Sequence, residues 1–207
     1  MLRGMVFVDH MNFDIALRKL YSDERQTPKL DYNTLFPGIV KELPNIDFLK
    51  AMLFSPKPDD FLMNDPHLRS YYKWTEGLKN AKYLDVVHGR YIARPVDEEV
   101  PMDISNRLPY YKVEKGTDIN MAVHILTKAF YDSFDVAFVV SADTDYLTVY
   151  QQLKTMGKIV VLVTVKGQPF GNIKSEVDNF IILNKDFFSR HLRVEKTKSE
   201  NLSSCKV

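Results

Sequence analysis

Acidic side chains stand directly after two apolar runs of this 207-residue chain. Asp9 follows the run at residues 5–8, and Asp143 and Asp145 follow the run at residues 136–140. A short, continuous apolar run is typical of a strand buried on both faces of a parallel sheet. Because parallel strands end at one edge of the sheet, Asp9 and Asp143 share a ligand crevice if their strands are neighbours.

Clustered carboxylates repel one another, and without a counter-charge their pKa values rise. A hard divalent cation relieves this repulsion, and a set of oxygen ligands favours Mg²⁺ or Mn²⁺ over zinc. Asp118 is a third candidate, because it opens an amphipathic segment just after Gly116. Its approach to the other carboxylates does not follow from strand order alone.

Structural roles compete with this interpretation. An Asp at a strand end or helix start is commonly a cap or a turn former, and for Asp118 or Asp145 taken singly that role explains the residue equally well. For Asp9 and Asp143 together on one sheet edge, the functional interpretation leads. Thr144 is the expected cap of the following helix, and Asn12 either orients a bound water or caps the first helix.

The fold class follows from the alternation of apolar runs with helix-period segments, which predicts a parallel α/β sheet of about five strands with helices on both faces. The expected strands are residues 5–8, 46–54, 83–88, 136–140 and 159–165, with 55–60 as a turn. Apolar residues at helical spacing predict helices over residues 13–21, 35–43, 68–78, 119–130 and 147–153, with a last one after 183. The second of these is expected to start near Thr34, which places Pro37 in its first turn.

Residues 89–116 form an irregular arm in which 89–94 and 109–113 pair as antiparallel strands around the loop 95–108. We expect one domain over residues 1–195 and a disordered tail over 196–207. Tyr71, Tyr72 and Trp74 stand at helical spacing and are expected to be core and helix surface, not a platform for stacking nucleobases.

The net charge is +1 from 28 basic and 27 acidic side chains, so binding to nucleic acid requires a local basic patch. The one cysteine excludes a disulfide framework and a cysteine metal cluster. No segment approaches the ~20 apolar residues of a membrane span, and no signal peptide core is present. We therefore expect a cytoplasmic protein without membrane contact. Nothing in the sequence argues against a homodimer.

Three motifs in order resemble the NYN-domain proteins of the PIN-like nuclease superfamily. The family patterns are hydrophobic-Asp-x-x-Asn, Lys-Gly-x-Asp and Ser-Gly-Asp-x-Asp-Phe, and the resemblance covers roughly residues 5–185. Each motif is weak alone, but three in order are fairly specific. The matching segments of this chain are Val6–Asn12, Lys115–Asp118 and Ser141–Tyr146.

The resemblance implies a Rossmann-like, PIN-type fold and metal-dependent endoribonuclease activity that leaves a 5′-phosphate and a 3′-hydroxyl. Asp9, Asp118 and Asp143 would bind Mg²⁺ or Mn²⁺, and Asp145 would support the metal through water as a fourth catalytic carboxylate. Asn12 and Ser141 would position substrate or water. The implied partner is single-stranded or structured RNA.

Basic residues around the arm, among them Arg90 and Lys115, are candidates for phosphate contact. For any one of them a solvated surface role is the commoner explanation, except for Lys115, which lies in the second motif. Two positions depart from the family pattern. His10 replaces a small residue and Ala142 replaces glycine, and both are expected to narrow the approach to the site.

Other functions stay open. A haloacid-dehalogenase phosphatase needs a second Asp where Met11 stands, and a topoisomerase–primase domain normally has Glu on its first strand. A nucleotide-dependent enzyme is disfavoured because no phosphate-binding glycine loop is present. The non-enzymatic alternative is a catalytically weak or inactive PIN-like domain that binds RNA or a protein partner as a regulator.

Overall fold

The computed structural model describes residues 1–194, and its centre is one seven-stranded sheet in the order β4-β3-β2-β1-β5-β6-β7. Six strands are parallel, and β4 is antiparallel to β3. The expected tail at 196–207 lies outside the described residues. The strands are β1 (Leu2–Asp9), β2 (Ile46–Pro58), β3 (Leu84–Pro95), β4 (Tyr110–Lys115), β5 (Val136–Val140), β6 (Ile159–Val165) and β7 (Asn179–Leu183).

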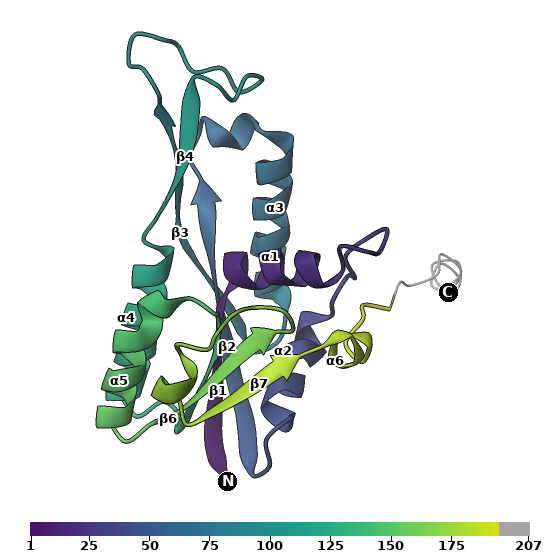
Figure 1. Cartoon of the computed structure of the whole chain (residues 1–207), viewed down its shortest axis with the longest axis vertical. Helices are drawn as coiled ribbons and strands as arrows, with labels where there is room; N and C mark the ends of the chain where they lie inside the picture. The colour runs from purple at the N-terminus through teal and green to yellow at the C-terminus, as the bar shows by residue number, and fades with distance from the viewer. Residues whose placement is uncertain (195–207) are drawn as a thin grey trace, which may run out of the picture.

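Helices cover both faces of this sheet, as the sequence predicts (Figure 1). An apolar core lies beneath the helices on each face. Side chains of α1, α2 and α6 pack on one face, while α4 and α5 pack on the other. None of the described helices is long and apolar enough to cross a membrane. The helices are α1 (His10–Leu20), α2 (Tyr32–Lys41), α3 (Pro66–Gly77), α4 (Thr117–Phe130), α5 (Leu147–Thr155) and α6 (Lys185–Ser189).

The sheet is larger than the five strands expected. The arm supplies β4, which pairs with the distal half of β3, so the predicted antiparallel pairing is confirmed. At the other edge, β7 pairs with β6. Its alternation of exposed and buried residues, typical of an edge strand, gives a weaker apolar signal than the central strands.

Strand β2 continues through the segment that was expected to turn. Pairing between β1 and β2 ends at Phe54, whereas pairing between β2 and β3 continues to Pro58. Beyond Phe54 one side of β2 is therefore an edge, where Pro56 and Pro58 can lack an N–H without breaking a ladder bond. The distal parts of β2, β3 and β4 form an arm that extends away from the rest of the sheet (Figure 1).

Helix starts differ from expectation at two places. Helix α2 begins at Tyr32 under an Asp31 cap, so Pro37 lies in its second turn and not in the first. Thr144 is not the cap of α5: Asp143 caps a 3₁₀ turn over Thr144–Tyr146, and α5 follows from it. In both cases an aspartate that precedes the expected start, Asp31 or Asp143, accepts a free backbone N–H of the first turn.

Candidate functional site

Asp9 lies at the carboxyl end of β1, between two strands that run parallel to it. Strand β1 pairs with β2 on one side and with β5 on the other, so the neighbour relation required for Asp9 and Asp143 is present. Asp9 is 6% exposed. One carboxylate oxygen accepts the Asn12 N–H at 3.1 Å, which caps α1, and the other accepts the Ser141 hydroxyl at 3.2 Å.

The charge of Asp9 is poorly compensated. Burial raises its pKa from 3.8 to about 6; the Asn12 N–H and the Ser141 hydroxyl act against this rise, and the charges of Asp118 and Glu114 add to it. Within residues 1–194, no lysine, arginine or histidine forms an ion pair with Asp9. Asp9 is therefore a capping residue that also carries the unrelieved charge expected of a cation ligand.

Asn12 ties the first motif to the third. Its side-chain oxygen accepts the Ala142 N–H at 3.1 Å and the Gln168 amide at 2.7 Å, while Gln168 accepts the Val165 N–H at the end of β6. Asn12 therefore holds the loop after β5 and the loop after β6 in place. Gln168 was not foreseen, because nothing in its local sequence distinguishes it from other loop residues.

Asp143 and Asp145 differ in their surroundings. The Asp143 carboxylate accepts the Asp145 N–H at 3.0 Å, and the Asp143 N–H donates to the Ser141 hydroxyl at 3.2 Å. Asp143 is half-buried, whereas Asp145 is exposed. Ser141 thus links Asp9 to the Asp143 backbone, and Asp145 contributes its N–H to the same turn.

Asp118 reaches this edge because β4 reverses the direction of the chain. Strand β3 rises past the end of β1, and β4 returns alongside it with Lys115 opposite Arg90. Gly116, at φ 79°, then starts α4. Gly89 allows the close passage, since a Cβ there would lie 2.7 Å from the Thr117 nitrogen and 2.8 Å from its Cα.

Tyr146 lies among the three carboxylates. It is 1% exposed, and its hydroxyl donates to Asp118 at 3.1 Å. Burial raises its pKa, and the charges of Asp9, Asp118 and Asp143 raise it further, so the phenol keeps its proton. All three carboxylates thus act on one buried hydroxyl that holds Asp118.

Glu114 and Lys115 are consecutive in β4, so their side chains point to opposite faces of the strand. Glu114, opposite Tyr91, is directed toward the site: desolvation and then Asp118 raise its pKa, and its charge acts on Asp9. Lys115 and Arg90 face each other on the opposite side of the arm, where they line a hollow of about 410 Å³. Glu114 was not predicted because it lies just before the second motif, which begins at Lys115.

A hollow of about 450 Å³ opens beside Asp143. Asn12, Ala142 and Thr144 line its near side, and the loop 169–173 lines the far side. Ala142 therefore borders the approach as expected. His10 does not line this hollow and is turned into the protein on the other side of α1, so it does not narrow this approach.

The carboxylates at this edge have the oxygen chemistry of a hard-cation site but do not form a closed one. In the described part of the chain, no three His, Cys, Asp or Glu side chains stand close enough to hold an ion by themselves. Mg²⁺ commonly takes only one or two carboxylates, with water and substrate phosphate completing its coordination. The oxygen donors of Asp9, Asp118 and Asp143 match that chemistry, and no nitrogen or sulfur ligand competes among them.

The sequence matches the NYN domain family over residues 3–184. The chain therefore belongs to the NYN domain family, which is part of the PIN-like nuclease superfamily. The match covers every residue of the three motifs. It supports a nuclease-type protein at the level of class.

No curated protein matches the sequence. Among solved structures, a protein of unknown function from Vibrio parahaemolyticus superposes with a TM-score of 0.54. The match covers 90% of this chain and 95% of that chain at 16% identity. A likeness at this identity shows a shared fold alone.

Proposed function

We propose that this protein is a metal-dependent ribonuclease that hydrolyses RNA phosphodiester bonds at the sheet edge formed by Asp9, Asp118 and Asp143. The observation that carries the proposal is Asp9: a buried carboxylate with a raised pKa and no cationic side chain paired to it. Membership of the NYN family supplies the reaction class.

Asp9, Asp118 and Asp143 would hold Mg²⁺ or Mn²⁺ together with water and substrate oxygens, and the ion would supply a water of lowered pKa and neutralise charge on the phosphate. The chain's own residues fix the carboxylates: Ser141 orients Asp9, and Tyr146 orients Asp118. The hollow beside Asp143 is the proposed place of the scissile phosphate. Asp145 remains a proposed supporter through water.

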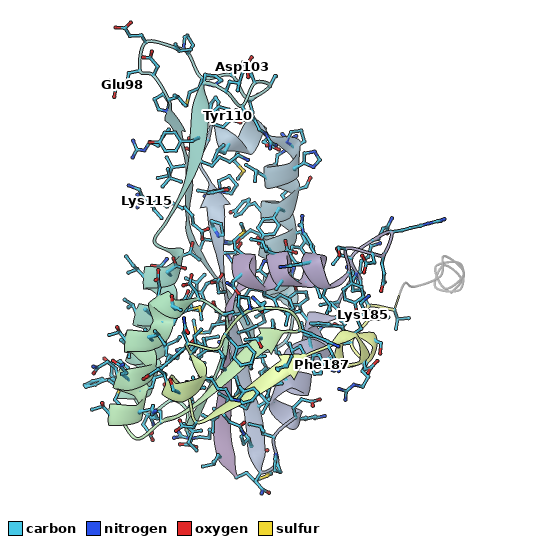
Figure 2. The ribbon with its side chains drawn as sticks, in the orientation of Figure 1. Glu98, Asp103, Tyr110, Lys115, Lys185 and Phe187 are labelled. Carbon is cyan, nitrogen blue, oxygen red and sulfur yellow. The ribbon has the colours of Figure 1, made fainter. Side chains whose placement is uncertain are left out.

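Arg90 and Lys115 remain proposed phosphate contacts outside the carboxylate cluster. Both are exposed, and neither forms an ion pair within the described residues. Farther along the arm, Glu98 and Asp103 lie at the tip (Figure 2). Their charge disfavours RNA at the tip itself.

The direct test is cleavage of end-labelled single-stranded RNA by purified protein with Mg²⁺ or Mn²⁺, against an EDTA control. Asp143→Asn is expected to lower the rate by ~100-fold or more, since even residues behind a metal ligand are worth 10- to 100-fold. Asn is also a good helix cap, so the fold is expected to persist.

Asp103→Asn is the matched control. Its carboxylate accepts the Ser105 N–H in a similar two-residue turn, but at the tip of the arm. It is expected to cleave like wild type. A wild type that is inert on several RNAs with both metals, yet binds RNA or a protein, would establish the regulatory alternative. Equal activity in Asp143→Asn would point to another site or a contaminant.

A further inference from the structure

His10 follows the buried carboxylate of Asp9 directly but belongs to a different environment. It is fully buried, with Nδ1 at the Tyr71 hydroxyl and Nε2 at 3.2 Å from the Tyr32 hydroxyl. Burial lowers its pKa to about 3, so the ring is neutral. A neutral imidazole offers one donor and one acceptor, so one tyrosine accepts from it and the other donates to it.

These contacts hold four rings together, which we name the aromatic cluster: His10, Tyr32, Tyr71 and Trp74. The Trp74 ring centroid lies 5.3 Å from His10, 5.7 Å from Tyr32 and 6.0 Å from Tyr71. The aromatic residues of α3 are core and helix surface, as expected, but they belong to two different groups. Tyr72 packs against His88, but Tyr71 and Trp74 belong to this cluster.

A cavity of about 600 Å³ opens on the aromatic cluster. Tyr32, Tyr71 and Trp74 line it, and Trp74 is 40% exposed although it is the largest apolar side chain of the protein. Arg18 and Arg193 also line it. The volume lies within the range of small-molecule sites, roughly 300–1,000 Å³.

The electrostatics of this cavity suit an anion with an aromatic ring. Arg18 pairs with Asp14 at 2.8 Å and remains largely exposed, so part of its guanidinium is open to a second oxygen ligand. Arg193 is exposed on the cavity wall. Planar guanidinium groups bind phosphate through paired hydrogen bonds, and aromatic faces stack on nucleobases.

We infer that this cavity binds one nucleotide of a single-stranded RNA, with its base against Tyr71 and Trp74 and its phosphate at Arg18 or Arg193. The inference rests on the proposed ribonuclease function and adds a second subsite to it. Arg18 lies nine residues beyond Asp9, or roughly 14 Å along the helix. A strand cut at the carboxylate edge can therefore place a nearby nucleotide here.

The protein itself carries the reporter for a test, because Trp74 is its single tryptophan. A short RNA oligonucleotide, added in EDTA to prevent cleavage, is expected to quench Trp74 fluorescence. AMP and UMP are expected to quench at higher concentrations, and ribose 5-phosphate, which lacks a base, is not. If AMP binds as tightly as the oligonucleotide, the cavity takes a free nucleotide and the strand assignment is wrong.

Variants separate phosphate contact from general effects. Arg18→Gln is expected to raise the oligonucleotide Kd by about 5-fold or more, and Arg69→Gln, an exposed arginine on α3 that does not line the cavity, to leave it unchanged. If Arg18→Gln lowers the Tm, the same measurement is made with Arg193→Gln instead. Equal affinity in both cavity variants would overturn the inference.

Cleavage kinetics distinguish this subsite from the carboxylate site. Trp74→Leu is expected to raise KM for RNA by about 10-fold with little change in kcat, since loss of stacking weakens binding. Quenching that persists in an inert protein would refute the proposed nuclease and leave this subsite standing. An active nuclease whose Trp74 responds to no oligonucleotide would refute only the subsite.

Discussion

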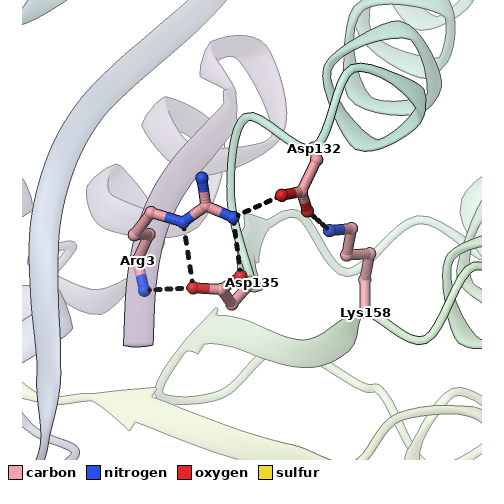
Figure 3. A network of polar contacts seen from close by, with 4 residues as sticks. All are labelled: Arg3, Asp132, Asp135 and Lys158. Atoms are coloured by element: carbon pink, nitrogen blue, oxygen red, sulfur yellow. Dashed lines mark hydrogen bonds and ion pairs between the residues drawn. The ribbon is translucent and has the colours of Figure 1, made fainter. Parts of the chain in front are cut away.

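At the amino-terminal end of the sheet, Arg3 lies between Asp132 and Asp135, and Lys158 completes the network from the start of β6 (Figure 3). The Arg3 guanidinium is 2.8 Å from Asp135 and 3.0 Å from Asp132. The hydrogen bond from this side chain lowers the Asp135 pKa to about 2. Two carboxylates here meet two cations of the same chain.

At the carboxyl-terminal end, Asp9, Asp118 and Asp143 meet no such cation among the described residues. The Asp9 pKa is raised to about 6, mainly by burial. Both ends use aspartates at strand termini, so residue type and position alone do not separate them. The difference is that the aspartates of the amino-terminal end pair with cations of the chain, whereas those of the other end pair with none among the described residues, which is the contrast that the proposed metal site would explain.

The largest expected contrast is in activity. Asp9→Asn is expected to reduce RNA cleavage by ~100-fold or more, because it removes a proposed metal ligand while its side-chain oxygen still caps α1. Asp135→Asn is expected to stay within about twofold of wild type while losing about 1–2 kcal/mol of stability, because it weakens hydrogen bonds to a charged partner. Initial rates and urea unfolding of both variants measure the contrast. Equal loss of activity in the two would show that the ends do not differ in function.

The contributions of Asp9 and Asp135 to the free energy of unfolding should change in opposite directions as pH rises. The folded chain keeps the Asp9 proton up to about pH 6, whereas the unfolded chain releases it near 3.8, so this group lowers stability as pH rises through that interval. Asp9→Asn should therefore match wild type near pH 4 and exceed it above pH 6, by at most about 3 kcal/mol. Asp135 stabilises above its unfolded pKa, and this contribution is lost as pH falls toward 2. Urea unfolding from pH 4 to 7 checks the Asp9 curve, and a constant gap would contradict it.

A smaller effect should follow from the hydroxyl that holds Asp118. Tyr146→Phe is expected to lower activity by about 10-fold and to raise the Mg²⁺ concentration for half-maximal rate. Tyr150→Phe is the matched control, because its buried hydroxyl has no hydrogen-bond partner in the described structure. Its loss should be neutral or slightly stabilising. If both variants keep full activity and metal dependence, the orientation of Asp118 does not depend on Tyr146.

Much of the architecture was predictable because buried parallel strands are continuous apolar runs. The β1 and β5 runs follow from that signal. That the two strands are neighbours, which puts Asp9 and Asp143 on one edge, was a condition of the prediction that the structure meets. The missing strands are those with weaker signals. Strand β7 is half-exposed, and β4, although its antiparallel pairing with β3 was predicted, was not counted in the expected sheet because it belongs to the irregular arm.

The sequence predicted the site residues that belong to motifs. It did not predict those that reach the site only through strand register or through contacts between distant segments. Asp118 could be named from its motif, but its arrival at the edge depends on the return of β4. Glu114 and Gln168 reach the site through strand alternation and a loop contact between distant residues. Tyr146 stands where the family pattern has Phe, and only the structure shows that its added hydroxyl contacts Asp118.

The pairing of β3 with β4 fixes where the chain re-enters the sheet edge after the arm. Register places Lys115 opposite Arg90, and three residues later the backbone delivers Asp118 to the edge. Residues added to the loop 96–109 leave this register unchanged, so the arm can vary in length without moving the site. One residue deleted from β4 shifts the pairing by one position, turns Glu114 away and draws α4 along by about 3.4 Å. The arm tip is free to diverge, whereas the six residues of β4 must keep their number.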